Sequence, residues 1–344
     1  MNYRRYRAPR IIGRQRGAAL VVALLVFALC TALIVAMKGE FDRFYQRAAN
    51  VMQAEQAYAY LRGAEDLAAM ALLIDYDTDK DSEQPRDDLG EIWAQPTTPY
   101  ALDEGGWLVG SLEDLQGRFN LNSLVGRPPE GADKPRFTAA QAQFIRLLQA
   151  LGEPAVSEQE AILITESIAD WLDQDAAPTA NGAEDDYYFS RDPAHRTANR
   201  PMASVSELRA VPYIAPEIYR AVRPWVAVWP QSSALLNIHT APAMVLRSIN
   251  ADNDLSPLSE SDGQSLVDYR ENSGFADVDD FLGNAVFGDK SEQMAGIKAL
   301  LGQSSSYFLL QAEVEVADRN MRLYSVLERS KRRITAIARA SGSL

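Results

Sequence analysis

The feature that most constrains this chain is an uncharged apolar run near its N-terminus, Ala18 to Met37. Its twenty residues contain no charge, proline or glycine, and as an α-helix they would span about 30 Å, the thickness of a bilayer's hydrocarbon core. Six arginines precede the run, and the first acidic residues follow it. The sequence therefore predicts a single transmembrane helix with its N-terminus in the cytoplasm and the bulk of the chain across the membrane.

Three other interpretations of this segment fit less well: a buried helix of a soluble protein, a cleaved signal peptide and a lipid anchor. A signal peptide also combines a basic and an apolar region, but here the apolar region is long and no small-x-small site with a polar loop follows it. Lipid attachment at Cys30 would need a small residue directly before the cysteine, where this chain has Leu29. Cys30 is better explained as a small apolar residue of the helix.

The charge of the remaining chain restricts its partners. The formal net charge is −13 and the first 17 residues contribute +6, which leaves −19 for residues 18–344. Such an acidic body repels phosphate backbones, so nucleic acid is not expected as a partner. The sequence also lacks phosphate-binding glycine motifs and an H-E-x-x-H pair, and neither His195 nor His239 stands in a catalytic setting. We therefore predict no enzymatic activity and no catalytic residue.

The boundary between the basic and the apolar region is abrupt. Basic residues end at Arg16-Gly17, and the apolar run starts at Ala18. This boundary resembles the cleavage site of type IV prepilins and pseudopilins, in which a prepilin peptidase removes a short basic leader ending in glycine and methylates the new amine. The resemblance implies that residues 1–17 are a leader, that the cut falls between Gly17 and Ala18, and that the mature protein stays in the bacterial inner membrane.

One position departs from that pattern. Pilins and major pseudopilins usually carry glutamate at mature position five, where this chain has Val22. The glutamate is thought to neutralise the terminal amine of an adjacent subunit inside the membrane, where an unpaired charge costs several kcal/mol. A subunit without this glutamate is expected at the end of a filament.

The apolar helix is predicted to continue beyond the membrane. Residues 10–84 contain no proline, and apolar residues recur at spacings near three, four and seven up to Leu61, which predicts one helix from Ala18 to about Asp75. A shorter anchor followed by a separate helix is the alternative. The acidic stretch 75–81 then ends the pattern. It lacks the glycine and the final glutamate of an EF-hand, so we interpret it as a solvated loop.

Strand signals occur in two places. Residues 106–112 and 118–122 flank a Gln-Gly turn and predict a hairpin. Residues 307–316 alternate apolar and polar side chains and predict a strand that pairs with residues 321–329. The stretch between these two places is predicted to be mostly helical, with helices over 138–151, 158–172 and 204–210. This pattern predicts an α+β protein, in which a long N-terminal helix packs on a small antiparallel sheet and a large helical domain is inserted between strands.

With these features together, the chain resembles the type II secretion system protein K family of minor pseudopilins, also called GspK, over nearly its full length. Beyond the leader and Val22, the resemblance rests on the order and spacing of five short motifs. These are QGRFNLN at 116–122, DWLDQD at 170–175, GAEDDYY at 182–188, ANRPM at 198–202 and NIHTAP at 237–242. The resemblance implies a pilin-like domain made of residues 18–122 and 307–344, and an inserted, mostly α-helical, SAM-like domain made of residues 123–306.

The same resemblance implies a function. It predicts a minor pseudopilin that caps the tip of the periplasmic pseudopilus and helps to initiate its assembly for protein export across the outer membrane. The implied partners are the I-type and J-type minor pseudopilins, the prepilin peptidase and inner membrane lipid, and the implied cofactor is calcium. The alternative is a membrane-anchored periplasmic DNA-binding protein, because residues 237–284 resemble helix-hairpin-helix arrays. The connecting stretch 250–254 is acidic and lacks glycine, however, and would repel a phosphate.

The residues themselves give partial support for calcium. The stretch from Asp170 to Asp192 contains seven acids and one base, and Gly182 within it allows a tight turn. Calcium takes six to eight oxygen ligands, and the acidic positions of this stretch include no histidine or cysteine of the kind that zinc or copper prefers. A solvated acidic loop is the alternative. We predict four side-chain ligands: Asp173, Asp175, Glu184 and Asp185.

Overall fold

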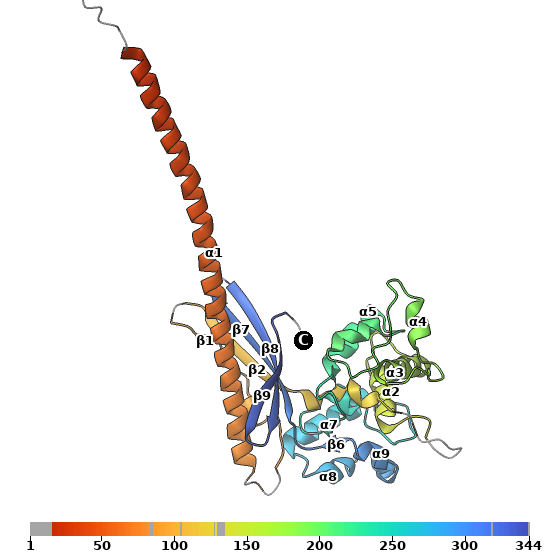
Figure 1. The fold of residues 1–344 in the computed structure, drawn as a ribbon. Coiled ribbons are helices and arrows are strands. Elements are labelled where there is room, and N and C mark those ends of the chain that lie inside the picture. Colours follow the sequence, from red (N-terminus) through yellow and green to blue (C-terminus); the bar gives the residue numbers. More distant parts are fainter. Residues whose placement is uncertain are drawn as a thin grey trace, which may run out of the picture. The chain divides into compact units, whose positions relative to one another are not determined.

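The computed structural model of the protein describes residues 16–342, apart from 81, 83–84, 104, 127, 129–134 and 318 (Figure 1). Residues 1–15 of the predicted leader lie outside this description. The chain divides into two compact units, residues 1–58 and residues 59–344.

Helix α1 (Arg16–Asp79) is one continuous helix of 64 residues. In the first unit its most apolar 18-residue window has a mean hydropathy of 3.0 and none of it is buried, so by length and composition this helix could cross a membrane. The predicted single helix from Ala18 to about Asp75 is confirmed, and it continues to Asp79. The interpretation of 75–81 as a solvated loop is wrong for its first part, because residues 75–79 are helical and Asp75 is only 4% exposed. The alternative of an anchor followed by a separate helix is wrong, because no break interrupts the helical hydrogen bonding between residues 16 and 79.

The second unit contains a five-stranded antiparallel sheet that packs against the last turns of α1 (Figure 1). Leu61, Ala64, Ala68 and Leu72 form the buried side of the helix, and they recur every three or four residues as helical packing requires. The strand order is β1-β2-β7-β8-β9. The strands are β1 (Tyr100–Ala101), β2 (Trp107–Asp114), β7 (Tyr307–Val316), β8 (Arg319–Ser330) and β9 (Arg333–Ala340).

The predicted pairing of residues 307–316 with 321–329 is confirmed, since β7 and β8 pair from Tyr307↔Glu328 to Val316↔Arg319. The apolar positions of β7 alternate as the sequence indicated, with Phe308, Leu310 and Ala312 buried. Strand β9 was not among the predicted strands.

The predicted hairpin of residues 106–112 with 118–122 is wrong. Strand β2 pairs with β7 instead, and β3 (Phe119–Asn120) pairs in parallel with β4 (Val226–Ala227). The physical reason is the 3₁₀ turn η2 (Leu115–Gly117), which leads the chain out of the five-stranded sheet after Asp114. Gly117 permits this exit, because a Cβ atom there would lie 2.7 Å from the hydroxyl of Thr240.

Between β2 and β7 lie residues 115–306, which we call the connecting segment (Figure 1); its regular elements are mainly short helices, joined by loops. Its α-helices are α2 (Ala139–Ala150), α3 (Glu158–Leu172), α4 (Asp185–Phe189), α5 (Pro216–Val222), α6 (Ala243–Leu246), α7 (Glu260–Asn272), α8 (Val278–Leu282) and α9 (Ala295–Lys298). The shorter elements are β5 (Leu236–Asn237), which pairs in parallel with β6 (Leu301–Gly302), and the 3₁₀ helices η3 (Leu121–Leu124), η4 (Val205–Ala210), η5 (Arg223–Trp225) and η6 (Gly288–Gln293).

Local sequence explains where these helices begin. Thr138 and Gln141 form a capping box at α2, and Ser157 caps α3. The predicted helices over 138–151 and 158–172 are therefore confirmed, whereas 204–210 is a 3₁₀ helix. Within the connecting segment, one apolar cluster lies around α2 and α3 and another lies around α6, α7 and α8. The predicted domain limits at 122/123 and 306/307 stay a prediction.

Candidate cation site and buried junction

The acidic loop that the sequence singled out lies between α3 and α4. Asp173 directly follows α3, and Glu184 directly precedes α4. One carboxylate oxygen from each of Asp173, Asp175 and Glu184 lies within 4.8 Å of the other two. The fold therefore brings together three of the four predicted ligands, although ten residues lie between Asp173 and Glu184 in the chain.

The fourth predicted ligand, Asp185, is not part of this group of three. Its Oδ1 accepts hydrogen bonds from the backbone N–H of Thr197 at 3.0 Å and from the Thr197 hydroxyl at 3.1 Å. The same hydroxyl lies 3.0 Å from Oε2 of Glu184. Asp185 therefore fixes the position of Thr197, and through it supports Glu184.

Crowded negative charge is the main electrostatic feature of this loop. The pKa of Glu184 is raised to about 6, first by burial and also by the neighbouring Asp170, Asp173 and Asp175 carboxylates, against a hydrogen bond from Thr197 that lowers it. Oε1 of Glu184 is buried and has no hydrogen-bond partner among the described residues. Such an oxygen is costly to leave without a partner. A positive charge next to Glu184 would therefore reduce the repulsion among the carboxylates and would give Oε1 of Glu184 the partner that it lacks.

Two acidic residues of α3 that the sequence did not single out as key residues hold this loop in shape. Asp170 is fully buried and accepts the backbone N–H of Thr179 at 3.0 Å, and Glu166 accepts the backbone N–H of Asn181 at 2.9 Å. Burial raises the pKa of Asp170 to about 6. A Cβ at Gly182 would lie 1.8 Å from the Asp170 carboxylate, so only glycine fits there. The usable signal was that Asp170 is the single acid among the apolar residues 168–172, which favours its burial.

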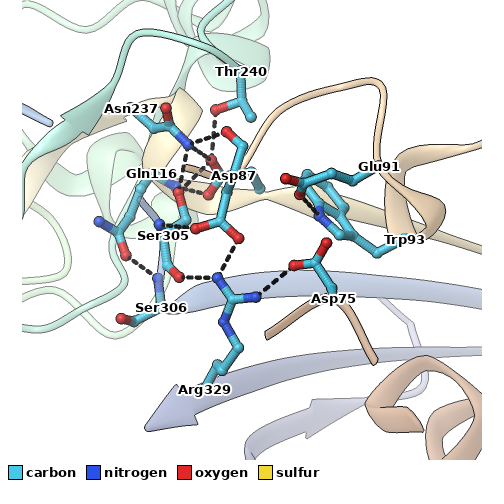
Figure 2. Close-up of polar contacts among 11 residues, drawn as sticks. Asp75, Asp87, Glu91, Trp93, Gln116, Asn237, Thr240, Ser305, Ser306 and Arg329 are labelled. Atoms are coloured by element: carbon cyan, nitrogen blue, oxygen red, sulfur yellow. Dashed lines mark hydrogen bonds and ion pairs between the residues drawn. The ribbon is translucent and has the colours of Figure 1, made fainter. Parts of the chain in front are cut away.

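A second group of carboxylates lies at the end of α1. Oxygens of Asp75, Asp79, Asp87 and Glu91 also lie within 4.8 Å of one another. Here a guanidinium is already present, because Arg329 of β8 donates to Asp75 Oδ2 at 2.7 Å and also to Asp87 (Figure 2). Burial raises the pKa of Glu91 to about 9 and that of Asp75 to about 6. Glu91 also accepts the indole N–H of Trp93 at 2.6 Å.

This second group continues into a buried network that joins the connecting segment to the sheet, which we call the junction. Its centre is Asn237, whose Nδ2 donates to the carbonyl of Asp87 at 2.9 Å, to Asp114 at 3.2 Å and to the Ser305 hydroxyl at 2.9 Å (Figure 2). Thr240 also donates to Asp114, at 2.5 Å. Burial raises the pKa of Asp114 to about 6.

The junction explains two of the motifs on which the sequence resemblance rested. Gln116 belongs to the first motif, and its Oε1 accepts the backbone N–H of Ser306 at 2.6 Å. Asn237 and Thr240 belong to the last motif. These polar residues therefore hold the start and the end of the connecting segment to the sheet.

The acidic stretch 250–254, which argued against DNA binding, has an internal role. Both carboxylate oxygens of Asp252 accept backbone N–H groups at the start of α9, from Gly296 at 2.7 Å and Ile297 at 2.9 Å. Asp254 pairs with Lys290 at 3.1 Å. The acids in this stretch therefore hold α9 and η6 in place. His239 is buried next to Arg86, and this burial lowers its pKa to about 4.

The predicted processing site lies in the first turns of α1. Gly17 and Ala18 are exposed, and nothing lies within 4 Å of a Cβ built at Gly17. Cleavage between them stays a prediction.

Comparison with known proteins gives consistent results. Residues 117–231 and residues 236–300 each match a family described as Type II secretion system (T2SS), protein K. The chain is 34% identical to Type II secretion system protein K of Pseudomonas aeruginosa over 95% of this chain and 93% of that protein. It is 31% identical to the protein of the same name from Pectobacterium carotovorum over 96% and 97% of the two chains.

A solved structure also resembles the chain. It is the crystal structure of the GspK-GspI-GspJ complex from the type 2 secretion system of enterotoxigenic Escherichia coli, to which this chain is similar with a TM-score of 0.73 and 27% identity. The similarity covers 87% of this chain and all of the matched chain. It extends over the α+β architecture of long helix, antiparallel sheet and many short helices.

Proposed function

Because this chain belongs to the type II secretion system protein K family, and is thus a minor pseudopilin of that system, we propose that it caps the tip of the periplasmic pseudopilus and helps to start its assembly. The observation that carries the proposal is the similarity to a GspK chain solved together with GspI and GspJ, over all of that chain. The partners at the tip are the corresponding I-type and J-type pseudopilins.

Two features of this chain support a place at the end of the filament. The connecting segment places 192 residues between β2 and β7, a bulk that would obstruct the stacking of identical subunits. Val22 is apolar at mature position five, where a subunit within the filament would need a carboxylate for its neighbour's amine. A tip subunit has no neighbour above it, so both features are compatible with that place and unfavourable elsewhere.

Labelling of pseudopili tests the position directly. An epitope on the full chain should be found at one end of each sheared pseudopilus by immunogold microscopy, and deletion of the chain should reduce the number of pseudopili. Label along the whole length would contradict the proposal.

We further propose that the N-terminus is cytoplasmic, that the bulk of the chain is periplasmic, and that the prepilin peptidase cuts between Gly17 and Ala18. The apolar α1 is consistent with an inner-membrane anchor, and the six arginines before it favour this orientation. Mass spectrometry of the membrane-extracted chain should find a methylated N-terminus at Ala18. A mature chain that starts after residue 37 would exclude the pseudopilin type of processing.

We also propose that the loop between α3 and α4 binds calcium. The donor set fits a hard cation, because carboxylate oxygens of Asp173, Asp175 and Glu184 converge within 4.8 Å and Oε1 of Glu184 is buried without a hydrogen bond among the described residues. These three residues would hold the ion, which would supply positive charge among the carboxylates. Asp170, Glu166 and Asp185 act on the loop instead, through their hydrogen bonds to the backbone at residues 179, 181 and 197.

The role that we propose is structural. The chain supplies a membrane anchor, a pilin-like body and a large connecting segment, and we infer that it catalyses no reaction itself. Energy for assembly then comes from other components of the secretion system.

A further inference from the structure

A polar cavity in the second unit is part of neither the proposed calcium loop nor the junction. It lies between residues 86–90, which connect α1 to η1 (Ile92–Ala94), and residues 270–274 at the C-terminal end of α7. His239 forms part of its wall, and its volume is about 540 Å³. Small-molecule sites in proteins measure about 300 to 1,000 Å³. The cavity is therefore large enough for a small organic ligand or for one side chain of another protein.

Arg270 offers the clearest binding group in this cavity. Its Nη1 donates to the carbonyls of Ile238 at 3.2 Å and Ala241 at 2.6 Å, which fixes the guanidinium in place. Its Nε and Nη2 make no hydrogen bond among the described residues, and neither atom is buried. The N–H groups of these two atoms lie along one edge, and this edge pairs with both oxygens of a carboxylate. The same pairing occurs elsewhere in the chain, where Nε and Nη2 of Arg322 donate to Glu313 at 3.0 and 3.2 Å.

Two further groups of the wall favour an anionic ligand. Arg86 donates from Nε to Asp88 at 3.0 Å and from Nη1 to the carbonyl of Phe275 at 3.3 Å, so within the described part of the chain its Nη2 stays without a hydrogen bond. His239 is only 2% exposed, and its Nε2 is buried with no partner among the residues that the structure describes. A buried polar atom without a partner is costly. Burial first, and then the charges of Arg86 and Arg270, lower the pKa of His239 to about 4, so the three groups lie close together.

The charges around the cavity restrict the class of ligand. Two arginines and two acids, Asp88 and Glu271, line it, so their formal charges cancel. Both oxygens of Asp88 already accept hydrogen bonds, one from Arg86 and one from the backbone N–H of Gly90 at 2.8 Å. The two acids would repel a dianion such as a phosphate monoester, whereas a monoanion that pairs with Arg270 meets less repulsion. A carboxylate, which is planar and singly charged, therefore fits best.

We propose that this cavity binds a ligand through a single carboxylate group, which pairs with the Nε and Nη2 edge of Arg270 beside Arg86. The carboxylate belongs to a small organic acid or to an aspartate or glutamate side chain of another protein. Arg86 directly precedes Asp87 of the junction, and His239 lies two residues after Asn237. A bound carboxylate would therefore also tie the junction to the end of α7. The site is independent of the proposed place at the filament tip, and it would remain if that place were wrong.

The test measures binding to the full chain in detergent, with calcium and ionic strength held constant. Sodium acetate is the probe, and saturation-transfer difference NMR of its methyl signal gives the dissociation constant. We expect saturable binding by acetate and none by acetamide, which has a similar shape but no charge. Ser273→Trp should abolish the binding, because Ser273 is exposed and lines the cavity, and the larger side chain would fill it.

Two further variants separate the carboxylate contact from general effects. Arg270→Lys should weaken binding about tenfold, because lysine keeps the charge but lacks an edge with two N–H groups. Arg270 also holds two carbonyls, so the melting temperature of this variant is measured without acetate. Ser273→Trp leaves those contacts intact and should keep the melting temperature of the unaltered chain. Ser233→Trp is the matched control, since Ser233 is an exposed serine outside the cavity, and it should leave binding unchanged.

A capped tripeptide, acetyl-Ala-Glu-Ala-amide, distinguishes the two sources of the carboxylate. Tighter binding by this peptide than by acetate, with none by the glutamine form of the peptide, assigns the site to a protein side chain. The reverse order assigns it to a small organic acid. The proposal is overturned if neither acetate nor the peptide binds saturably, if Ser273→Trp binds acetate as the unaltered chain does, or if methyl phosphate binds more tightly than acetate.

Discussion

Two groups of carboxylates in this protein crowd negative charge into a small volume, and the positive charge that balances them has a different source in each group. At the end of α1, Asp75 and Asp87 lie against the guanidinium of Arg329, which is part of the fold. In the loop between α3 and α4, Glu184 is hydrogen-bonded to Thr197, and no ion pair with lysine or arginine reaches it among the described residues. The first group is complete with the chain alone, whereas the second is completed, under our proposal, by a cation from solution.

The largest loss of stability is expected when Arg329, which balances the charge of Asp75 and Asp87, is replaced. Arg329→Met keeps an unbranched apolar side chain but leaves Asp75 and Asp87 buried without their partner, since Asp87 is only 1% exposed. We expect the free energy of unfolding at pH 8 to fall by about 3 to 5 kcal/mol, measured by urea denaturation.

The control for this variant is Arg332→Met. Arg332 pairs with Asp77 at 2.8 Å, but its side chain is 75% exposed, and such surface pairs contribute about 1 kcal/mol or less. Equal losses in the two variants would show that burial of the pair at Arg329 does not matter.

Removal of calcium should have the next largest effect. If the loop binds calcium and the unfolded chain does not, calcium at a hundredfold excess over its dissociation constant should stabilise the chain by about 2.7 kcal/mol relative to chelator. This stabilisation appears as a higher melting temperature in calcium than in chelator. Glu184→Gln should abolish most of that difference, because it removes the charge of a buried ligand.

Two controls sharpen the comparison between the groups. Asp186→Asn changes an exposed acid two residues from Glu184, and Asp79→Asn changes the group at the end of α1. Both variants should keep the full response to chelator. If the response to chelator disappears in Asp79→Asn, calcium binds the carboxylates at the end of α1 and not the loop between α3 and α4. If the unaltered chain has the same melting temperature with calcium and with chelator, the loop is only a solvated acidic loop.

A further effect is expected from pH at the junction, measured in saturating calcium. Burial raises the pKa of Glu91 from its usual value near 4.5 to about 9, so the folded chain holds a proton that the unfolded chain releases. The stability that this proton contributes is complete below about pH 4.5 and is lost as the pH rises toward about 9. The raised pKa values of Asp75 and Asp114, both about 6, act in the same direction.

Glu91→Gln should therefore reduce the decline of the melting temperature between about pH 5 and 9, because glutamine stays neutral throughout that range. Glu217→Gln is the control, since Glu217 lies on the surface of α5 and pairs with the exposed Arg220. A pH profile of Glu91→Gln that matches the unaltered chain would mean that Glu91 is ionised in the folded state.

The sequence predicted an element correctly where its apolar residues repeat with a regular period over many positions. Helix α1 and the pair β7 and β8 were predicted correctly because their apolar residues repeat over many positions. The hairpin at 106–122 was wrong because the turn signal Gln116-Gly117 serves to leave the sheet, and the true partner of β2 begins at Tyr307. A local turn signal contains no information about a partner that is nearly 200 residues away.

The sites show the same limit. Asp173, Asp175 and Glu184 could be selected from a dense local run of acids, and the fold does bring them together. Arg329 could not be assigned to Asp75 and Asp87, because 254 and 242 residues separate them from it in the chain. The role of Asp170 was not predicted either, since it depends on the position of Thr179, whose backbone N–H it accepts in the folded loop.

The exit of the chain after β2 also has a consequence for the order of folding. Strands β2 and β7 are direct neighbours with Asp114 opposite Phe308, yet the connection between them is 192 residues long instead of the few residues of an ordinary hairpin. Closing so long a loop costs about 3 kcal/mol more in chain entropy than closing a four-residue turn. Folding of the connecting segment brings its two ends together and removes most of that cost. We therefore expect the connecting segment to fold first, and the sheet that it interrupts in the sequence to close only after the last strands have been synthesised.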